Sequence, residues 1–415
     1  MMIEQIKRLR KDELIRGSII LFVMIIIYNL LNYAFQISMA RMLGPADYGI
    51  LAVLMSFIYI FSIPNESIQT VITKYVSKLN TNKSFGKIRY LVFRSIKKSL
   101  LFAVIIYILL IPVAFFLSSY LKIDIFLILI TFLFIFYVFI FPIVRGVLQG
   151  QKKFFGLGLS LVVESLIRVI FAVILVMISW KVYGAMIGTY IGSILAFVLG
   201  FFMLGEILKS KNEREEFGNI YRDSVPIIIA MTALAVMYSI DIIFARRFFS
   251  PEIAGQFAFV SLIGKTIFFV SSAIGKTMFP MMSEDIDETR KKSSRLFRKS
   301  ILVVSMISVI ALVLFFFWSS LIIRIVSLGS EQYLPSANLL FILGLAYSFL
   351  SLCNIVLLYG ISSNRLGKKA YFLLIFAALQ AVLMFMFNKN TFEFSIALMI
   401  SNLIILVYSI WMVKK

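Results

Sequence analysis

The chain has 415 residues, of which 61% are hydrophobic, and its 41 Lys and Arg exceed its 20 Asp and Glu to give a net charge of +21. A soluble domain does not need so many apolar side chains, and runs of roughly 20 apolar residues, enough to cross a bilayer, recur along the sequence. The sequence has no histidine, which excludes imidazole acid–base chemistry and argues against zinc. We expect no cofactor and no metal.

Twelve apolar segments are predicted to be transmembrane helices, because a backbone in lipid must satisfy its hydrogen bonds within its own segment. They are residues 17–40, 48–73, 99–120, 123–144, 155–179, 183–207, 223–247, 253–280, 299–323, 335–360, 369–387 and 393–412. The predicted fold is therefore an all-α integral membrane protein without a soluble domain.

The positive charges are distributed unequally between the two sides of the membrane. With the N-terminus inside, 31 of the 41 Lys and Arg fall in cytoplasmic segments, 7 in outer loops and 3 within spans. Positive loops stay in the cytoplasm, so we predict a multi-pass protein of the cell membrane with both termini cytoplasmic. These charges face anionic membrane lipids, so no nucleic-acid partner is needed to explain them.

A sequence repeat indicates two halves. The segment "ARMLGPADYGIL" (40–51) resembles "ARRFFSPEIAGQF" (245–257): each has Ala-Arg, a proline, and a glycine four residues after the proline. We predict two six-helix halves, residues 1–208 and 209–415, around a central cavity. Both copies have the same orientation, which is a transporter arrangement with substrate bound between the halves.

Several ionisable residues fall inside spans, where a charge is costly unless it faces the bundle interior or a wet cavity. Glu164 and Arg168 are four residues apart and can pair on one helix, either as a structural bridge or as a functional site. Asp241 has no partner in its own segment, and a lysine of the next span is one candidate. Glu66 either lines the cavity or reaches the cytoplasmic interface.

Two of the intramembrane lysines belong to a repeated tetrapeptide, Ile-Gly-Lys-Thr, at 263–266 and 274–277. A phosphate-binding loop is excluded, because the glycine it requires five residues earlier is Phe259 in one copy and Val270 in the other. Residues eleven positions apart share a helix face, at a separation of about 16 Å. Lys265 and Lys276 are therefore predicted to form a cationic stripe that faces the interior.

The first span adds polar side chains at spacings of three and four, which either line a cavity or bond a neighbouring helix. Together these observations give two sets of candidate site residues. Expected to bind an anionic substrate are Lys265, Lys276, Arg41 and Arg168; expected to line the cavity or to couple transport to an ion are Asp241, Glu164, Glu66, Asn29, Asn32 and Gln36. The glycines at 184, 188 and 192 are predicted to form a helix-packing ridge.

The segment "ARMLGPADYGIL", after a first span, resembles the start of the polysaccharide-export flippases of the O-antigen and teichoic-acid type, and "RGVLQGQKKF" (145–154) resembles a second feature of that family. These flippases belong to the same superfamily as the multidrug and toxic-compound extruders. The resemblance implies a flippase that moves a polyprenyl-pyrophosphate-linked oligosaccharide from the inner to the outer leaflet for surface polysaccharide biosynthesis. It also implies glycosyltransferases or a polysaccharide polymerase as partners.

Two alternatives remain open. A cation-coupled multidrug extruder of the same fold would use a carboxylate such as Asp241 or Glu164. A membrane-embedded polysaccharide polymerase or ligase needs a catalytic platform outside, yet the longest outer connection, about 324–334, has only Arg324 and Glu331 as charged groups. The chain is therefore predicted not to be an enzyme.

Overall fold

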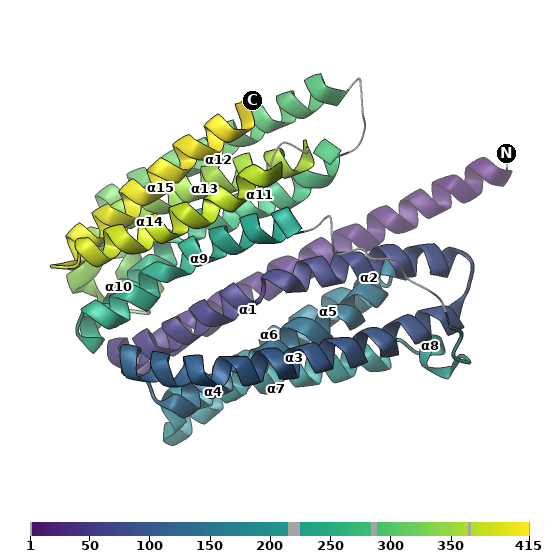
Figure 1. Cartoon of the computed structure of the whole chain (residues 1–415), viewed down its shortest axis with the longest axis horizontal. Helices are drawn as coiled ribbons and strands as arrows, with labels where there is room; N and C mark the ends of the chain where they lie inside the picture. The colour runs from purple at the N-terminus through teal and green to yellow at the C-terminus, as the bar shows by residue number, and fades with distance from the viewer. Residues whose placement is uncertain (1, 215–224, 284–288, 364–366, 415) are drawn as a thin grey trace. The chain divides into compact units, whose positions relative to one another are not determined.

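The computed structural model describes residues 2–214, 225–283, 289–363 and 367–414 (Figure 1). For residues 2–16, 18, 225–228, 275–283, 289–294, 362, 367–368 and 414 it describes the backbone alone. Helices connected by short turns make up the described residues, which contain no strand. The all-α prediction is confirmed.

The chain forms two compact units, one of residues Met1–Leu43 and Phe61–Ile220, the other of Gly44–Ile60 and Tyr221–Lys415. The first unit contains the start of α1 (Met2–Phe61) and then α2 (Ile63–Thr81), α3 (Phe85–Leu121), α4 (Ile125–Phe132), α5 (Phe134–Gly150), α6 (Phe154–Leu175), a π-helical turn (Val176–Trp180), α7 (Lys181–Phe202) and α8 (Glu206–Lys209). The predicted halves, 1–208 and 209–415, stay a prediction; by internal contacts, residues 44–60 group with the second unit.

The second unit contains α9 to α15 and the end of α1. Its helices are α9 (Val225–Phe248), α10 (Pro251–Gly264), α11 (Thr266–Ser283), α12 (Thr289–Val326), the 3-10 helix η3 (Glu331–Leu339), α13 (Leu340–Ser362), the 3-10 helix η4 (Gly367–Tyr371), α14 (Phe372–Met386) and α15 (Thr391–Lys414). Helix α13 lies at the centre of this unit, packed by α10, α11, α12 and α15.

The described helices have room for all twelve predicted spans. Ten helical stretches of the described chain are long and apolar enough to cross a membrane. Two of them, Ile19–Thr81 with 63 residues and Phe154–Phe202 with 49, are each long enough for two crossings of roughly 20 residues. The protein is thus a multi-pass membrane protein.

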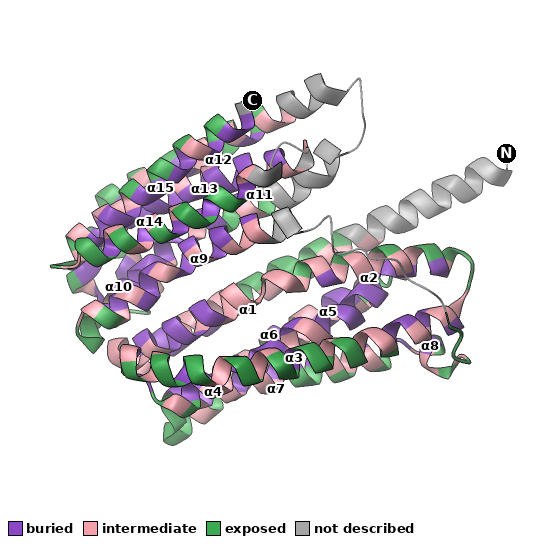
Figure 2. Ribbon diagram, in the orientation of Figure 1, coloured by how far each residue is buried: buried purple, intermediate pink, exposed green. Residues whose placement is uncertain are grey.

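The outward faces of the helices are apolar, as lipid requires. Figure 2 shows exposed residues along α3 and α12, and these include large apolar side chains such as Leu109, Phe116, Phe316 and Phe317, all more than 60% exposed. In water, such a surface would drive aggregation; in a bilayer it contacts acyl chains. The buried polar groups described below therefore lie in a low-dielectric surrounding.

Helix α1 breaks where the two units divide. Gly44 has φ 71° and ψ 172°, a conformation that glycine adopts at little cost. Pro45 then begins the second helical segment, where its fixed φ suits a first turn and its missing N–H costs nothing. The Gly-Pro pair of the first repeat copy therefore separates two spans.

The two copies of the repeat pack against each other within the second unit. A Cβ on Gly49 would lie 3.1 Å from the backbone of Gly255, and a Cβ on Gly255 would overlap the carbonyl of Pro45. Both glycines stand four residues after their prolines, one in the second segment of α1 and the other in α10, whose first turn begins with Pro251. The repeat thus has a packing function, because its glycines allow two helix backbones to touch.

The predicted glycine ridge of α7 is confirmed. A Cβ on Gly188 would lie 2.5 Å from the backbone nitrogen of Ala172, and one on Gly192 would lie 2.5 Å from the carbonyl oxygen of Glu164. Helices α6 and α7 therefore pack backbone to backbone, which brings side chains of α7 up to Glu164.

Gly255→Ala should destabilise the protein by about 3 kcal/mol, because the new methyl group overlaps a backbone carbonyl that cannot rotate away. The matched control is Gly156→Ala in α6, whose nearest neighbour is the flexible tip of Met203 at 3.1 Å. Thermal unfolding in detergent should show a large loss for the first variant and a change within about 1 kcal/mol for the second. Equal melting temperatures would contradict this packing contact.

Candidate functional site

Among the described residues, each unit buries a cluster of charged side chains between its helices. In the second unit the cluster is centred on Asp241 of α9, which is fully buried. The Lys265 ammonium, at the junction of α10 and α11, donates to Asp241 Oδ1 at 3.0 Å. The Lys265 side chain is itself 3% exposed, so the two charges neutralise each other out of contact with solvent.

Hydroxyl groups occupy the other oxygen of Asp241. The Ser261 hydroxyl of α10 donates to Asp241 Oδ2 at 2.7 Å, and the Tyr347 hydroxyl of α13 donates to the same oxygen. The rings of Tyr238 and Tyr347 lie 4.6 Å and 5.3 Å from the Lys265 ammonium nitrogen. Lys265 is therefore enclosed by a carboxylate and two aromatic rings.

Side-chain amides hold the backbones of α9 and α13 beside this cluster. Gln380 of α14 donates to the carbonyl of Met237 at 3.1 Å, one turn before Asp241. Asn402 of α15 donates to the carbonyl of Ala346 at 3.0 Å, next to Tyr347. These bonds tie the site to two further helices and fix its geometry.

In the first unit the cluster is centred on Glu164 of α6, which is 1% exposed. The closest cation is Arg145 of α5, with Nη2 2.6 Å from Glu164 Oε2. Arg168, one turn along α6, has Nη2 3.6 Å from Oε1. The Tyr137 hydroxyl donates at 2.9 Å, and the Ser193 hydroxyl of α7 donates at 3.4 Å, where the glycine ridge brings α7 close.

The two clusters differ in net charge. In the second unit, the charges of Asp241 and Lys265 cancel. Among the described residues, Glu164 is the one carboxylate that forms an ion pair with Arg145 or Arg168, so two guanidinium groups share one negative charge. The cluster of the first unit therefore holds one positive charge that no described ion pair balances.

Arg168 retains unused donor capacity. Its Nη1 donates to Asn32 Oδ1 of α1 at 2.6 Å, whereas its buried Nε has no hydrogen-bond partner. An unsatisfied buried N–H on a charged group is costly and marks a position where a ligand, ion or water is expected. The Arg168 side chain is 12% exposed, against 8% for Arg145.

The remaining predicted site residues differ in how far they are buried. Asn29, Arg41 and Glu66 are exposed, and Gln36 is half-buried on α1. In the polar strip on the first span, Asn32 accepts a hydrogen bond from Arg168. Lys276 lies in α11, but its side chain is outside the described residues, so the lysine stripe stays a prediction.

Sequence reasoning missed Arg145 and the tyrosines. The fourth predicted span ended at residue 144 and so left Arg145 in a connecting segment, but α5 continues to Gly150, and Arg145 is buried within it, 4.2 Å above the ring of Phe141. An arginine at the inner end of one span, preceding an acidic residue in the next, is the signal that could have identified it. Tyr137 and Tyr347 had no such signal, because tyrosines are numerous in this sequence.

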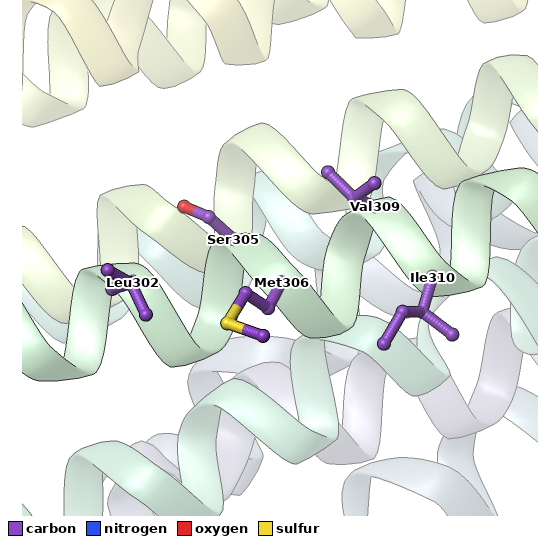
Figure 3. A pocket seen from close by; sticks show the side chains of 5 residues that line it. All are labelled: Leu302, Ser305, Met306, Val309 and Ile310. Carbon is purple, nitrogen blue, oxygen red and sulfur yellow. The ribbon is translucent and has the colours of Figure 1, made fainter.

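No group of three or more His, Cys, Asp or Glu side chains that could hold a metal occurs in the described ranges. A depression of about 360 Å³ lies along α12, lined by Leu302, Ser305, Met306, Val309 and Ile310 (Figure 3). These residues follow one face of one helix and four are exposed apolar side chains. This surface suits lipid tails rather than a polar ligand.

Arg145→Ala should destabilise the protein by about 3–5 kcal/mol, because it leaves the buried Glu164 without its closest cation. Arg168→Ala should cost about 1–2 kcal/mol, since its nitrogen is farther from the carboxylate and its side chain is less buried. Thermal unfolding of the purified variants in detergent measures both. If Arg168→Ala were the more damaging, the assignment of Arg145 as the main partner of Glu164 would be wrong.

Comparisons with known structures identify the fold. The chain is similar to the lipid II flippase MurJ in an inward closed conformation, with a TM-score of 0.73 at 17% identity over 96% of this chain and 88% of that one. It is also similar to an inward-facing multidrug resistance MATE family transporter of the MOP superfamily, with a TM-score of 0.70 at 14% identity over 93% and 94%. A third similar structure is a MOP superfamily transporter from Pyrococcus furiosus. Its TM-score is 0.59, at 14% identity over 98% of this chain and 97% of that one.

At these identities the likeness shows the fold alone. No curated protein sequence matches the chain significantly. The sequence profile described as "Polysaccharide biosynthesis protein" matches residues 14–286, more than half of the 415 residues. The chain therefore belongs to the polysaccharide biosynthesis protein family of membrane proteins, with the fold of the MOP superfamily transporters.

Proposed function

We propose that the protein is a flippase that moves a polyprenyl-pyrophosphate-linked oligosaccharide from the inner to the outer leaflet of the cell membrane. Membership of the polysaccharide biosynthesis family supports the class of substrate, and the transporter fold supports movement across a bilayer. Glycosyltransferases would supply the substrate on the inner side, and a polymerase would consume it on the outer side.

The observation that carries this proposal is the surplus positive charge of the buried cluster around Glu164 in the first unit. A pyrophosphate is negative on both phosphates, and it must pass a region of low dielectric constant. Two unit charges 4 Å apart attract by about 4 kcal/mol at an effective dielectric constant of about 20. Two arginines that share a single carboxylate provide that attraction, whereas an organic cation would be repelled.

Arg168 is the residue we assign to contact the pyrophosphate. A guanidinium group binds phosphate oxygens through two parallel N–H groups, and Arg168 has an unpartnered Nε beside its Nη2. Asn32 holds the opposite nitrogen and so orients the group. Of the other predicted cations, Lys265 is engaged by Asp241, and Arg41 is exposed on α1.

The extruder alternative rests on the fold likeness to the MATE transporter. An extruder of organic cations needs a carboxylate that can meet its substrate. Asp241 and Glu164, the candidates for that role, are both held in ion pairs with cations of the protein. Their negative charges are therefore neutralised within the protein, which favours an anionic substrate.

Arg168→Ala should reduce transport roughly 10- to 100-fold, the loss of a charge-assisted contact of about 1.5–3 kcal/mol. Arg168→Lys should retain part of the activity, because the charge stays while the forked geometry is lost. The measurement is complementation of a flippase-null strain, read as surface polysaccharide per amount of membrane-inserted protein. The matched control is Arg324→Ala, since Arg324 forms an exposed pair with Glu331 at 2.9 Å.

Full complementation by Arg168→Ala would remove Arg168 from the substrate site. Failure of the wild-type protein to complement, together with efflux of cationic dyes on overexpression, would favour the extruder instead.

The orientation in the membrane is part of the same proposal. Without Arg145, which is buried in α5, 30 Lys and Arg fall in the proposed cytoplasmic segments against 7 in outer loops. The asymmetry remains large, so both termini are assigned to the cytoplasm.

Single cysteines at Lys122 and Lys389 should react with an impermeant maleimide added to intact cells, and one at Asn82 should not. All three positions are exposed in turns between helices. The background is Cys353→Ser, a conservative change at a buried residue whose sulfur lies 3.2 Å from the Ser409 hydroxyl. Labelling of Asn82 from outside would reverse the orientation.

A further inference from the structure

We propose that Glu164 is the protein's own counter-anion for Arg168, and that the pyrophosphate of the substrate takes its place. Without substrate, the carboxylate holds the Arg168 guanidinium loosely. With substrate, a phosphate oxygen holds it instead, and Glu164 stays paired with Arg145 alone. The inference rests on the proposed function, because it assigns to Glu164 the control of how tightly that same site binds the pyrophosphate.

The contact between Glu164 and Arg168 is the weaker ion pair of the cluster. Arg168 Nη2 lies 3.6 Å from Glu164 Oε1, whereas a charge-assisted hydrogen bond between nitrogen and oxygen is about 2.7–2.9 Å long. Arg145 Nη2 lies 2.6 Å from Glu164 Oε2. Arg168 can therefore leave the carboxylate at a smaller cost than Arg145 can.

Arg145 is held in place by contacts outside the ion pair. Its Nε donates to the Ser160 hydroxyl at 3.3 Å, and its guanidinium carbon lies 4.2 Å from the ring centre of Phe141. Arg145 therefore remains beside Glu164 when a second anion arrives. The charges then match one to one, Glu164 with Arg145 and the pyrophosphate with Arg168.

The carboxylate oxygen that faces Arg168 has other partners. The Tyr137 hydroxyl lies 2.9 Å from Glu164 Oε1 and 3.1 Å from Oε2, and the Ser193 hydroxyl lies 3.4 Å from Oε1. A buried carboxylate that loses its partners is strongly destabilised. These hydroxyls keep Oε1 hydrogen-bonded when Arg168 turns away, so the exchange leaves no buried charge without a partner.

Helix α1 keeps the Arg168 guanidinium in position during this exchange. Arg168 Nη1 donates to Asn32 Oδ1 at 2.6 Å, and its guanidinium carbon lies 5.6 Å from the ring centre of Phe35. Neither contact involves Glu164, so both can persist when the carboxylate is replaced. The buried Nε, which has no hydrogen-bond partner, is then available to a phosphate oxygen.

Glu164 lowers the affinity for pyrophosphate in two ways. It occupies Arg168, and its own negative charge repels a phosphate bound within a few ångströms in a low-dielectric interior. A transport site must bind its cargo weakly enough to let it leave. The carboxylate thus makes a strongly cationic pair of arginines into a reversible site.

Glu164→Gln should bind a polyprenyl diphosphate at least about tenfold more tightly than the wild type does. The amide keeps the size of the side chain and can still accept hydrogen bonds from the hydroxyls, but it carries no negative charge. Affinities are measured by native mass spectrometry of the purified protein in lipid nanodiscs, with the polyprenyl alcohol of equal chain length as the reference. A gain in affinity for the diphosphate alone is a result that damage to the fold would not produce.

Three further variants isolate the role of the carboxylate. Glu331→Gln, the matched control, removes a negative charge from the exposed pair with Arg324 and should bind as the wild type does. In an Arg168→Ala background, Glu164→Gln should lose most of its gain, because the gain acts through Arg168. Tyr137→Phe should weaken binding roughly two- to tenfold, since Glu164 without that hydroxyl depends more on Arg168.

The outcomes separate this inference from the proposed function. If the wild type prefers the diphosphate but folded Glu164→Gln binds it no more tightly, the counter-anion role is wrong and the pyrophosphate site stands. A gain that persists in full without Arg168 would also overturn the role. Equal affinity of the wild type for the two lipids would remove the site and the inference together. If Glu164→Gln does not fold, Tyr137→Phe decides, and unchanged or tighter binding by that variant contradicts the inference.

Discussion

A charge buried in the membrane must be balanced within the same group of packed helices, and the polar interior of this protein follows from that constraint. Both described clusters join neighbouring spans: α5 with α6 through Arg145 and Glu164, and α9 with the α10–α11 junction through Asp241 and Lys265. These ion pairs form only if the helices that carry the two side chains pack closely. The glycines of α7 let it approach α6 at Glu164, and Gly255 lets α10 approach the second segment of α1.

The two units meet this constraint differently. In the second unit one acid and one base cancel, and hydroxyls and aromatic rings complete the enclosure. In the first, two arginines share one acid, and Arg168 keeps an unpartnered buried Nε. We infer that the two clusters have different roles. The charges of the second unit's cluster balance each other, whereas the cluster of the first unit attracts the anionic part of the substrate. The same asymmetry favours a lipid-linked pyrophosphate over an organic cation.

Much of this could be predicted from the sequence, because the membrane constrains local pattern strongly. Apolar length predicted where the helices lie, but several helices are longer than the predicted spans: α3 begins at Phe85, whereas its predicted span begins at residue 99. Spacing along one helix predicted the Glu164–Arg168 pair. It could not show that Arg145 of another helix lies closer, nor that Tyr347 and Ser261 enclose Lys265, because such contacts depend on how separate helices pack. From the sequence Lys265 was expected to bind substrate, whereas in the structure it forms an ion pair with Asp241.

The central claim, that the first unit provides a cationic position for a lipid-linked pyrophosphate, is tested most directly by binding. The purified protein in lipid nanodiscs is titrated with a polyprenyl diphosphate and with the polyprenyl alcohol of equal chain length, and native mass spectrometry gives the two affinities. The account predicts that the diphosphate binds at least about tenfold more tightly and that Arg168→Ala removes most of this preference. Equal affinities for the two lipids, or a preference unchanged in Arg168→Ala, would contradict it.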